Sequence, residues 1–180
     1  MNSRLRIVLI VVVVVGGAAL LGVGALMLKA DQDAAVAKFG EAVINLCKGD
    51  MTATVSGRLP ENAKLVFIDA NSATVEGSYQ PKLSTASAAT SKDDVTHVAC
   101  VKKVDALHNV LEYGATGKYK CRQYARNLEI GIFDAKTNQQ IAFYTVKGNT
   151  PPTCPDKTDK SLTKYGTPPE AAEVFRAIGI

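Results

Sequence analysis

The chain has 180 residues, of which 47% are hydrophobic and 6% aromatic, and its formal net charge is +4 at pH 7. Two of its 21 basic residues, Arg4 and Arg6, precede a long apolar run, which leaves 19 basic against 17 acidic residues in the rest of the chain. This larger part is nearly neutral and has no basic run with interleaved aromatic side chains. Such a composition excludes nucleic acid as the expected partner.

Residues 7–28 form an apolar run, IVLIVVVVVGGAALLGVGALML, without a charged side chain. As a helix this run would extend about 33 Å, enough to cross a hydrocarbon core of about 30 Å. Arg4 and Arg6 predict that the tail, residues 1–6, stays in the cytoplasm and that the C-terminal part lies outside. We therefore predict a single-pass signal-anchor helix that contacts the lipid bilayer of the cell membrane and an extracytoplasmic C-terminal domain.

A cleaved signal peptide is the alternative interpretation of the same pattern. Its apolar core is usually about 7 to 15 residues long, which is shorter than the run here. Leu28, Lys29 and Ala30 follow without the small-x-small spacing that cleavage requires. The sequence favours the uncleaved anchor.

Four cysteines, Cys47, Cys100, Cys121 and Cys154, follow the predicted span. An even number outside the cytoplasm predicts two disulfide bonds, and the absence of C-x-x-C argues against a redox or zinc motif. The sequence allows three pairings. We favour Cys47 with Cys154, which ties the start of the domain to its end, and Cys100 with Cys121.

Helical and strand signals alternate through the rest of the chain. Residues 29–48 have apolar side chains at helical spacing and predict an amphipathic helix or stalk. This helix should end near Gly49, where glycine can adopt the left-handed conformation of a C-terminal cap. Strands are predicted at residues 64–70 and 74–79, and residues 95–113 contain a third, VTHVACVKKV. A further long strand is predicted from Lys118, with a bulge near Arg122 or Gln123. Residues 80–94 are predicted to form a polar loop.

The clearest local signal is a hairpin around Ala135-Lys136-Thr137-Asn138, in which Asn138 can adopt a left-handed conformation. Pairing Asp134 with Gln139 would place Ile132 opposite Ile141 and Ile130 opposite Phe143. Tyr144 and Val146 would then point to the other, half-covered face. We predict these two residues as a partner-binding surface, with coverage by the helices as the alternative.

At the C-terminus, Thr167-Pro168-Pro169-Glu170 predicts a helix start with Thr167 as the cap. Ala171, Val174, Phe175 and Ile178 form one apolar stripe that should dock on the domain. Residues 49–180 are therefore expected to form an extracytoplasmic α+β domain with a mainly antiparallel sheet and flanking helices.

The order of these signals resembles a group of uncharacterised membrane-anchored bacterial proteins. The resemblance covers most of residues 44–155 and is carried by Leu46-Cys47-Lys48-Gly49, Ala99-Cys100-Val101, the hairpin FDAKTNQQ and Pro152-Thr153-Cys154-Pro155. The hairpin is also similar to the D-x-x-T-G turn of envelope lipoproteins that assist wall synthesis or secretion, with Asn138 in place of glycine. Neither resemblance implies an activity or a functional residue.

No catalytic or metal-binding motif is present in the sequence. His97 and His108 lack carboxylates or cysteines at ligand spacing, and Ser161 to Lys164 only imitates a Ser-x-x-Lys motif in an irregular segment. We expect no enzyme activity and no cofactor. We predict an interaction or assembly domain at the cell envelope, whose partner is an envelope protein or a second copy of the chain. A small-ligand carrier is the alternative, and an envelope enzyme is the least favoured class.

Overall fold

A computed structural model describes residues 26–114 and 116–180 of the chain. The predicted membrane span, residues 7–28, lies almost entirely outside the described residues. Within the described part, no helix combines the length and the apolar character that crossing a membrane would require.

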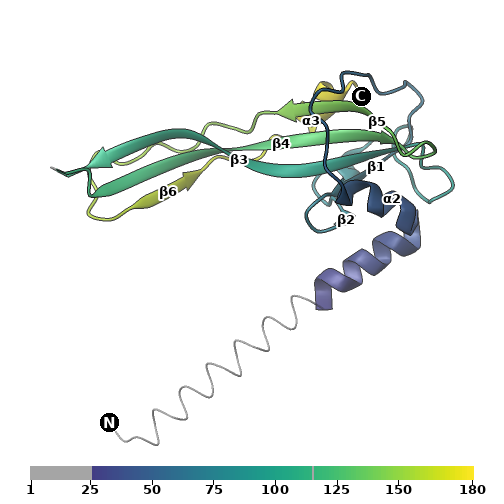
Figure 1. The fold of residues 1–180 in the computed structure, drawn as a ribbon, viewed down its shortest axis with the longest axis horizontal. Coiled ribbons are helices and arrows are strands. Elements are labelled where there is room, and N and C mark those ends of the chain that lie inside the picture. Colours follow the sequence, from purple (N-terminus) through teal and green to yellow (C-terminus); the bar gives the residue numbers. More distant parts are fainter. Residues whose placement is uncertain (1–25, 115) are drawn as a thin grey trace, which may run out of the picture.

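The described residues form an α+β fold around a six-stranded mixed sheet (Figure 1). The strands are β1 (Leu65–Asp69), β2 (Thr74–Val75), β3 (His97–Tyr113), β4 (Tyr119–Asp134), β5 (Gln140–Val146) and β6 (Leu162–Tyr165). The strand order is β2-β1-β3-β4-β5, and β6 pairs with β4 beyond the end of β5. Neighbouring pairs are antiparallel except β1 with β3 and β4 with β6, which are parallel. The α+β class is confirmed, and the sheet is mixed.

Short helices cover the two faces of the sheet. One face packs against a helix at residues 26–39, α2 (Glu41–Asn45) and the 3-10 turn η1 (Leu46–Lys48), which contribute Phe39 and Ile44 to a buried cluster. The opposite face packs against α3 (Ala171–Ile178), which contributes Val174 and Ile178. The chain also forms a 3-10 turn, η2 (Gln80–Lys82), in the predicted polar loop.

The amphipathic helix predicted for residues 29–48 is interrupted at Gly40. This residue has φ +87°, a conformation that favours glycine, and the chain changes direction there before α2 begins. The apolar stripe still packs as expected, because Ala35 and Phe39 are buried on the sheet. Gly49 has an extended conformation, so the predicted left-handed cap at this position is wrong.

The C-terminal helix docks as predicted but begins later than predicted. Its N-cap is Glu170 instead of Thr167, and a capping box joins the Glu173 carboxylate to the Glu170 N–H at 2.8 Å. Ala171, Val174 and Ile178 are buried, which confirms the apolar stripe.

Two disulfide bonds are confirmed, but the favoured pairing is wrong. The bonds are Cys47–Cys100 and Cys121–Cys154. Cys100 lies opposite Gly131, which is ten residues beyond Cys121 in β4, so about 33 Å of strand separates Cys100 from Cys121. The first bond joins the end of the N-terminal helical segment to the central strand, and the second joins β4 to the segment before β6.

The hairpin between β4 and β5 is confirmed, including the left-handed Asn138 with φ 58°. Its register differs from the prediction, because Ile132 lies opposite Ala142 and Ile130 opposite Tyr144. A bulge at Ile141 inserts one residue into β5, and one residue reverses which side chains face the core. The predicted placement of Tyr144 and Val146 on the opposite face is therefore wrong.

Removal of the two disulfides should affect different parts of the molecule. Each closes a long loop, with sequence separations of 53 and 33 residues, so replacing either pair by alanine should lower the free energy of unfolding by about 4 kcal/mol. Hydrogen exchange should show that Cys47→Ala/Cys100→Ala weakens protection of β1 and β3. Cys121→Ala/Cys154→Ala should weaken protection near β6 alone. Peptide mapping without reduction checks the pairing itself, and Cys47–Cys154 peptides would contradict it.

His97 makes the stability of the fold dependent on pH. Burial lowers its pKa below the ordinary 6.5, and the opposing charge of Asp134 only partly offsets this. The unfolded chain therefore binds the proton more readily than the folded chain, and stability should fall as the pH drops below about 6.5 towards the lower pKa of the folded state. Urea unfolding between pH 7 and 5 should show this decline. It should be smaller in His97→Gln and unchanged in His108→Gln, whose histidine is exposed.

Candidate interaction surface

The second half of β3 and the first half of β4 extend beyond the rest of the sheet as a long twisted arm (Figure 1). We define the arm as residues 102–113 of β3, residues 119–127 of β4, and β6. The rest of the described domain is the body. β1 pairs with β3 only as far as Val101, and β5 pairs with β4 only from Leu128 onward. The arm therefore begins where both neighbouring strands of the body end.

The C-terminal segment secures the β4 side of the arm. The Cys121–Cys154 disulfide and the parallel pairing of β6 with Cys121 to Tyr124 hold this segment along β4. The Tyr113 hydroxyl donates to the Pro155 carbonyl at 2.6 Å, and Gln123 Nε2 donates to the Pro152 carbonyl at 2.8 Å. β4 is therefore paired on both sides near the tip, whereas β3 in the arm pairs with β4 alone among residues 26–114 and 116–180.

Large apolar side chains are exposed on β3 of the arm. Leu107, Leu111 and Val110 have exposed fractions of 59%, 41% and 36%. In an antiparallel pair, residues opposite each other share a face, so Leu107 lies on the face of Tyr124, and Leu111 lies on the face of Cys121. Apolar surface is thus present on both faces of the same strand.

Aromatic and cationic side chains stiffen the β4 side of the arm. The rings of Tyr124 and Tyr165 stack with centroids 5.6 Å apart, and the Arg126 guanidinium lies 4.7 Å from the Tyr165 centroid. Near the tip, the Lys120 ammonium lies 2.7 Å from the Glu112 carboxylate and lowers the pKa of that carboxyl. Both contacts join neighbouring strands and favour the extended pairing.

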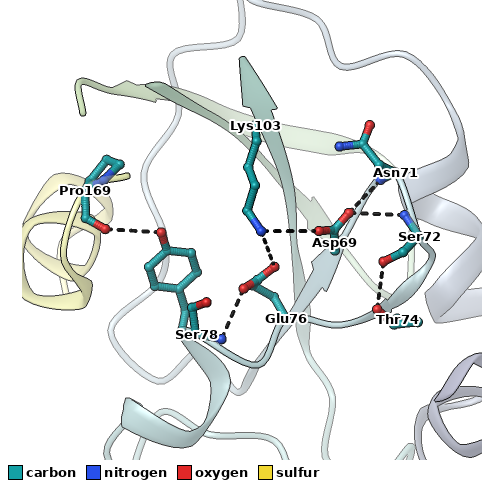
Figure 2. Close-up of polar contacts among 9 residues, drawn as sticks. Asp69, Asn71, Ser72, Thr74, Glu76, Ser78, Lys103 and Pro169 are labelled. Atoms are coloured by element: carbon teal, nitrogen blue, oxygen red, sulfur yellow. Dashed lines mark hydrogen bonds and ion pairs between the residues drawn. The ribbon is translucent and has the colours of Figure 1, made fainter. Parts of the chain in front are cut away.

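An ion cluster lies where the arm leaves the body (Figure 2). Lys103 of β3 reaches two carboxylates, Glu76 at 3.5 Å and Asp69 at 3.7 Å. Glu76 has an exposed fraction of only 5%, so its charge requires a partner. Lys103 supplies that partner, and it thereby attaches the base of the arm to β1 and to the segment after β2.

The same carboxylates organise the adjoining loops (Figure 2). Asp69 accepts the N–H groups of Asn71 and Ser72 at 2.8 and 3.1 Å, and Glu76 accepts the N–H of Ser78 at 3.1 Å. Tyr79 is buried and donates its hydroxyl to the Pro169 carbonyl at 3.2 Å, next to α3. Burial, with a smaller contribution from the Glu76 charge, raises the pKa of Tyr79 to about 12. We interpret this cluster as a structural joint between arm and body, because both carboxylates pair with Lys103 and accept backbone N–H groups of the adjoining loops.

The residues that the sequence suggested as a partner surface belong to the body. Val146 is 8% exposed and packs in the cluster under α3, and Tyr144 is half-buried against the same cluster. A segment at residues 55–57 follows the outer edge of β5, where Gly57 approaches so closely that a Cβ would lie 2.0 Å from the Ile141 carbonyl oxygen. The alternative in which other elements cover this face therefore agrees with the structure.

Tyr144 also lines an open groove of about 590 Å³ between residues 56–61, β5 and the end of α3. Arg58, Glu61 and Arg176 contribute charge to its walls. Within residues 26–114 and 116–180, no group of three or more His, Cys, Asp or Glu side chains is placed to hold a metal ion. His97 is buried against the body, and His108 lies at a bulge in the arm.

The arm was missed by sequence reasoning, although a signal for it exists. Residues 102–113 read KKVDALHNVLEY, in which apolar and polar side chains mix without the uniform apolar character of the preceding HVACV. A strand that changes from fully buried to mixed marks the point at which it leaves the core. A bulge is present next to the predicted position, but it lies in β3 instead of β4. The extra residue is His108, because Leu107 pairs with Tyr124 and Asn109 pairs with Gln123.

No family model, no curated protein and no solved structure matches this chain.

Removing the Lys103 ammonium should weaken the joint between arm and body. Lys103→Met keeps the aliphatic stem but leaves the buried Glu76 without its cation, which should cost about 1 to 3 kcal/mol of unfolding free energy. Lys102→Met, at an exposed neighbouring position, serves as the control and should change stability by less than about 0.5 kcal/mol. Equal effects of the two substitutions in chemical denaturation would show that the cluster contributes nothing.

Proposed function

We propose that this protein is a membrane-anchored interaction or assembly domain at the outer face of the cell membrane, and that the arm is its binding element. The observation that carries the proposal is the outer edge of β3 from Lys102 to Tyr113, which has no neighbouring strand among the described residues and carries exposed Leu107, Val110 and Leu111. Such edges pair readily with a strand from another chain.

The arrangement of the rest of the domain supports this proposal. The N-terminal helical segment is joined covalently to β3 through Cys47–Cys100, so a chain anchored through residues 7–28 would hold the body close to the bilayer. Two disulfides suit an oxidising compartment outside the cytoplasm. The core of the body is filled on both faces of the sheet, and the apolar side chains of the arm are left for contact with a partner.

A small-ligand carrier is the alternative, and the groove beside Tyr144 is the feature that favours it. Its volume of about 590 Å³ lies within the usual range for small-molecule sites. Arg58 and Arg176 on its walls would favour an anionic ligand. A Tyr144→Ala/Arg176→Ala variant that loses a bound small molecule, detected by native mass spectrometry, would support the carrier.

Cross-linked co-purification of the full-length chain from its native membrane tests the proposed interaction. The variant Leu107→Asp/Leu111→Asp changes two exposed side chains and should abolish recovery of the partner while leaving the fold intact, because neither residue is part of the core. Ile180→Asp is the matched control, since Ile180 is 40% exposed but lies in the body, and it should retain the partner. Equal recovery with all three chains would contradict the role of the arm.

A further inference from the structure

The free edge of β3 has a defined hydrogen-bonding pattern. The Val101 carbonyl accepts the Ala70 N–H at 2.8 Å, so the peptide groups of Val101 point toward β1. Peptide groups alternate in direction along a strand, which directs those of Lys103 and Asp105 outward as well. At these positions no strand of the described residues receives them.

The bulge at His108 shifts this alternation by one residue. After the bulge, the outward peptide groups belong to the even-numbered residues Val110 and Glu112 and no longer to odd-numbered residues. The Val110 N–H confirms this direction, because it donates to the side chain of its own neighbour, Asn109 Oδ1, at 2.8 Å. The outward groups of the edge are therefore odd-numbered before the bulge and even-numbered after it.

This shift makes the edge complementary to itself. When two copies of one strand pair antiparallel, the residue number rises along one copy and falls along the other. The two numbers of every opposed pair therefore add up to the same sum. Outward groups meet outward groups only when that sum is odd, as in Lys103 opposite Glu112 and Asp105 opposite Val110. The same condition places residues on matching faces, so Val104 lies opposite Leu111 of the second copy.

We propose that the partner of the arm is a second copy of this chain, with the two β3 strands paired antiparallel about a two-fold axis between Leu107 and His108. This inference rests on the proposed function and names its partner. The ladder runs from Lys102 opposite Tyr113 to Tyr113 opposite Lys102, and it joins the two sheets into one. Pairing replaces the bond from Val110 to its own Asn109 by a bond to the Asp105 carbonyl of the second copy.

Charge selects this register over its neighbours. In this register Lys103 of each copy lies opposite Glu112 of the other copy. Because Lys103 also contacts Glu76 and Glu112 also contacts Lys120, negative and positive side chains would alternate from one copy to the next. A shift by one pair in one direction opposes Asp105 to Glu112, which sets like charges together twice.

Space excludes the shift in the other direction. That register would place Glu112 of the second copy opposite Val101, whose edge β1 already occupies. The proposed ladder begins at Lys102, the first residue of β3 that β1 leaves free. The free length of the edge and its charge pattern thus indicate the same pairing.

Sedimentation of the full-length chain in detergent micelles tests the dimer with Asp105→Pro and Asp105→Asn. Proline at position 105 removes an outward N–H that the pairing of β3 with β4 does not use, and proline is tolerated on an edge strand. It deletes two bonds of the symmetric ladder, so the dissociation constant should rise about tenfold or more. Asn keeps the N–H and loses the same surface ion pair with Arg126, so this variant should dimerise as the wild type does. Circular dichroism confirms that both variants fold.

Cross-linking between differently tagged chains tests the register. A chain with Val104→Cys mixed with a chain with Leu111→Cys should form the intermolecular disulfide under mild oxidation, because directly opposed strand residues without hydrogen bonds lie about 4.5 Å apart. Ala106→Cys mixed with Leu111→Cys represents the shifted register and should cross-link at least about fivefold less by the same spacing argument. Comparable yields would overturn the proposed register.

The outcomes separate this inference from the proposed function. A wild-type chain that stays monomeric, or a dimer equally strong in Asp105→Pro and Asp105→Asn, overturns the β3 dimer. In that case, a different protein recovered with the wild type and lost with Leu107→Asp/Leu111→Asp would still support an interaction role for the arm. Loss of both results would overturn both proposals.

Discussion

The structure depends on the fact that one strand, β3, belongs to two environments. Its first five residues, His97 to Val101, lie between β1 and β4 and are buried on both faces. The remaining residues keep the pairing with β4 but have neither β1 nor a core behind them. Because the β3–β4 ladder runs through both environments, the arm inherits its direction from the core. Cys100 lies in the buried part and joins the helical layer to this same strand.

Local features of the fold could be predicted from the sequence. The apolar stripe of α3, the packing of Phe39, the strand β1 and the turn at Asn138 each depend on a few adjacent residues. Periodicity and turn chemistry describe such short-range effects well. The number of disulfides also followed from the even count of cysteines and the expected compartment.

Features that depend on distant residues could not be predicted. The cysteine pairing depends on where Cys100 lies along a ladder of sixteen residue pairs, and no spacing in the sequence contains that information. The face of the sheet on which Tyr144 lies depends on the single extra residue Ile141 in β5. Alternation of apolar and polar residues does not reveal such an insertion. For the arm, the mixed pattern of residues 102–113 indicates where β3 leaves the core, but it does not indicate whether another strand pairs with the edge of β3. The predicted membrane span, residues 7–28, lies almost entirely outside the described residues, and it stays a prediction.

The Cys47–Cys100 bond also decides how mechanical load would pass through the molecule. A pull on the N-terminal helix would reach the sheet through a covalent bond at its central strand and bypass the packing of Phe39 and Ile44. Between Cys100 and the tip of the arm, that load would run along the covalent backbone of β3, and only its transfer to β4 would place the β3–β4 hydrogen bonds in shear. A domain built in this way resists extension between its N-terminal side and the tip of the arm.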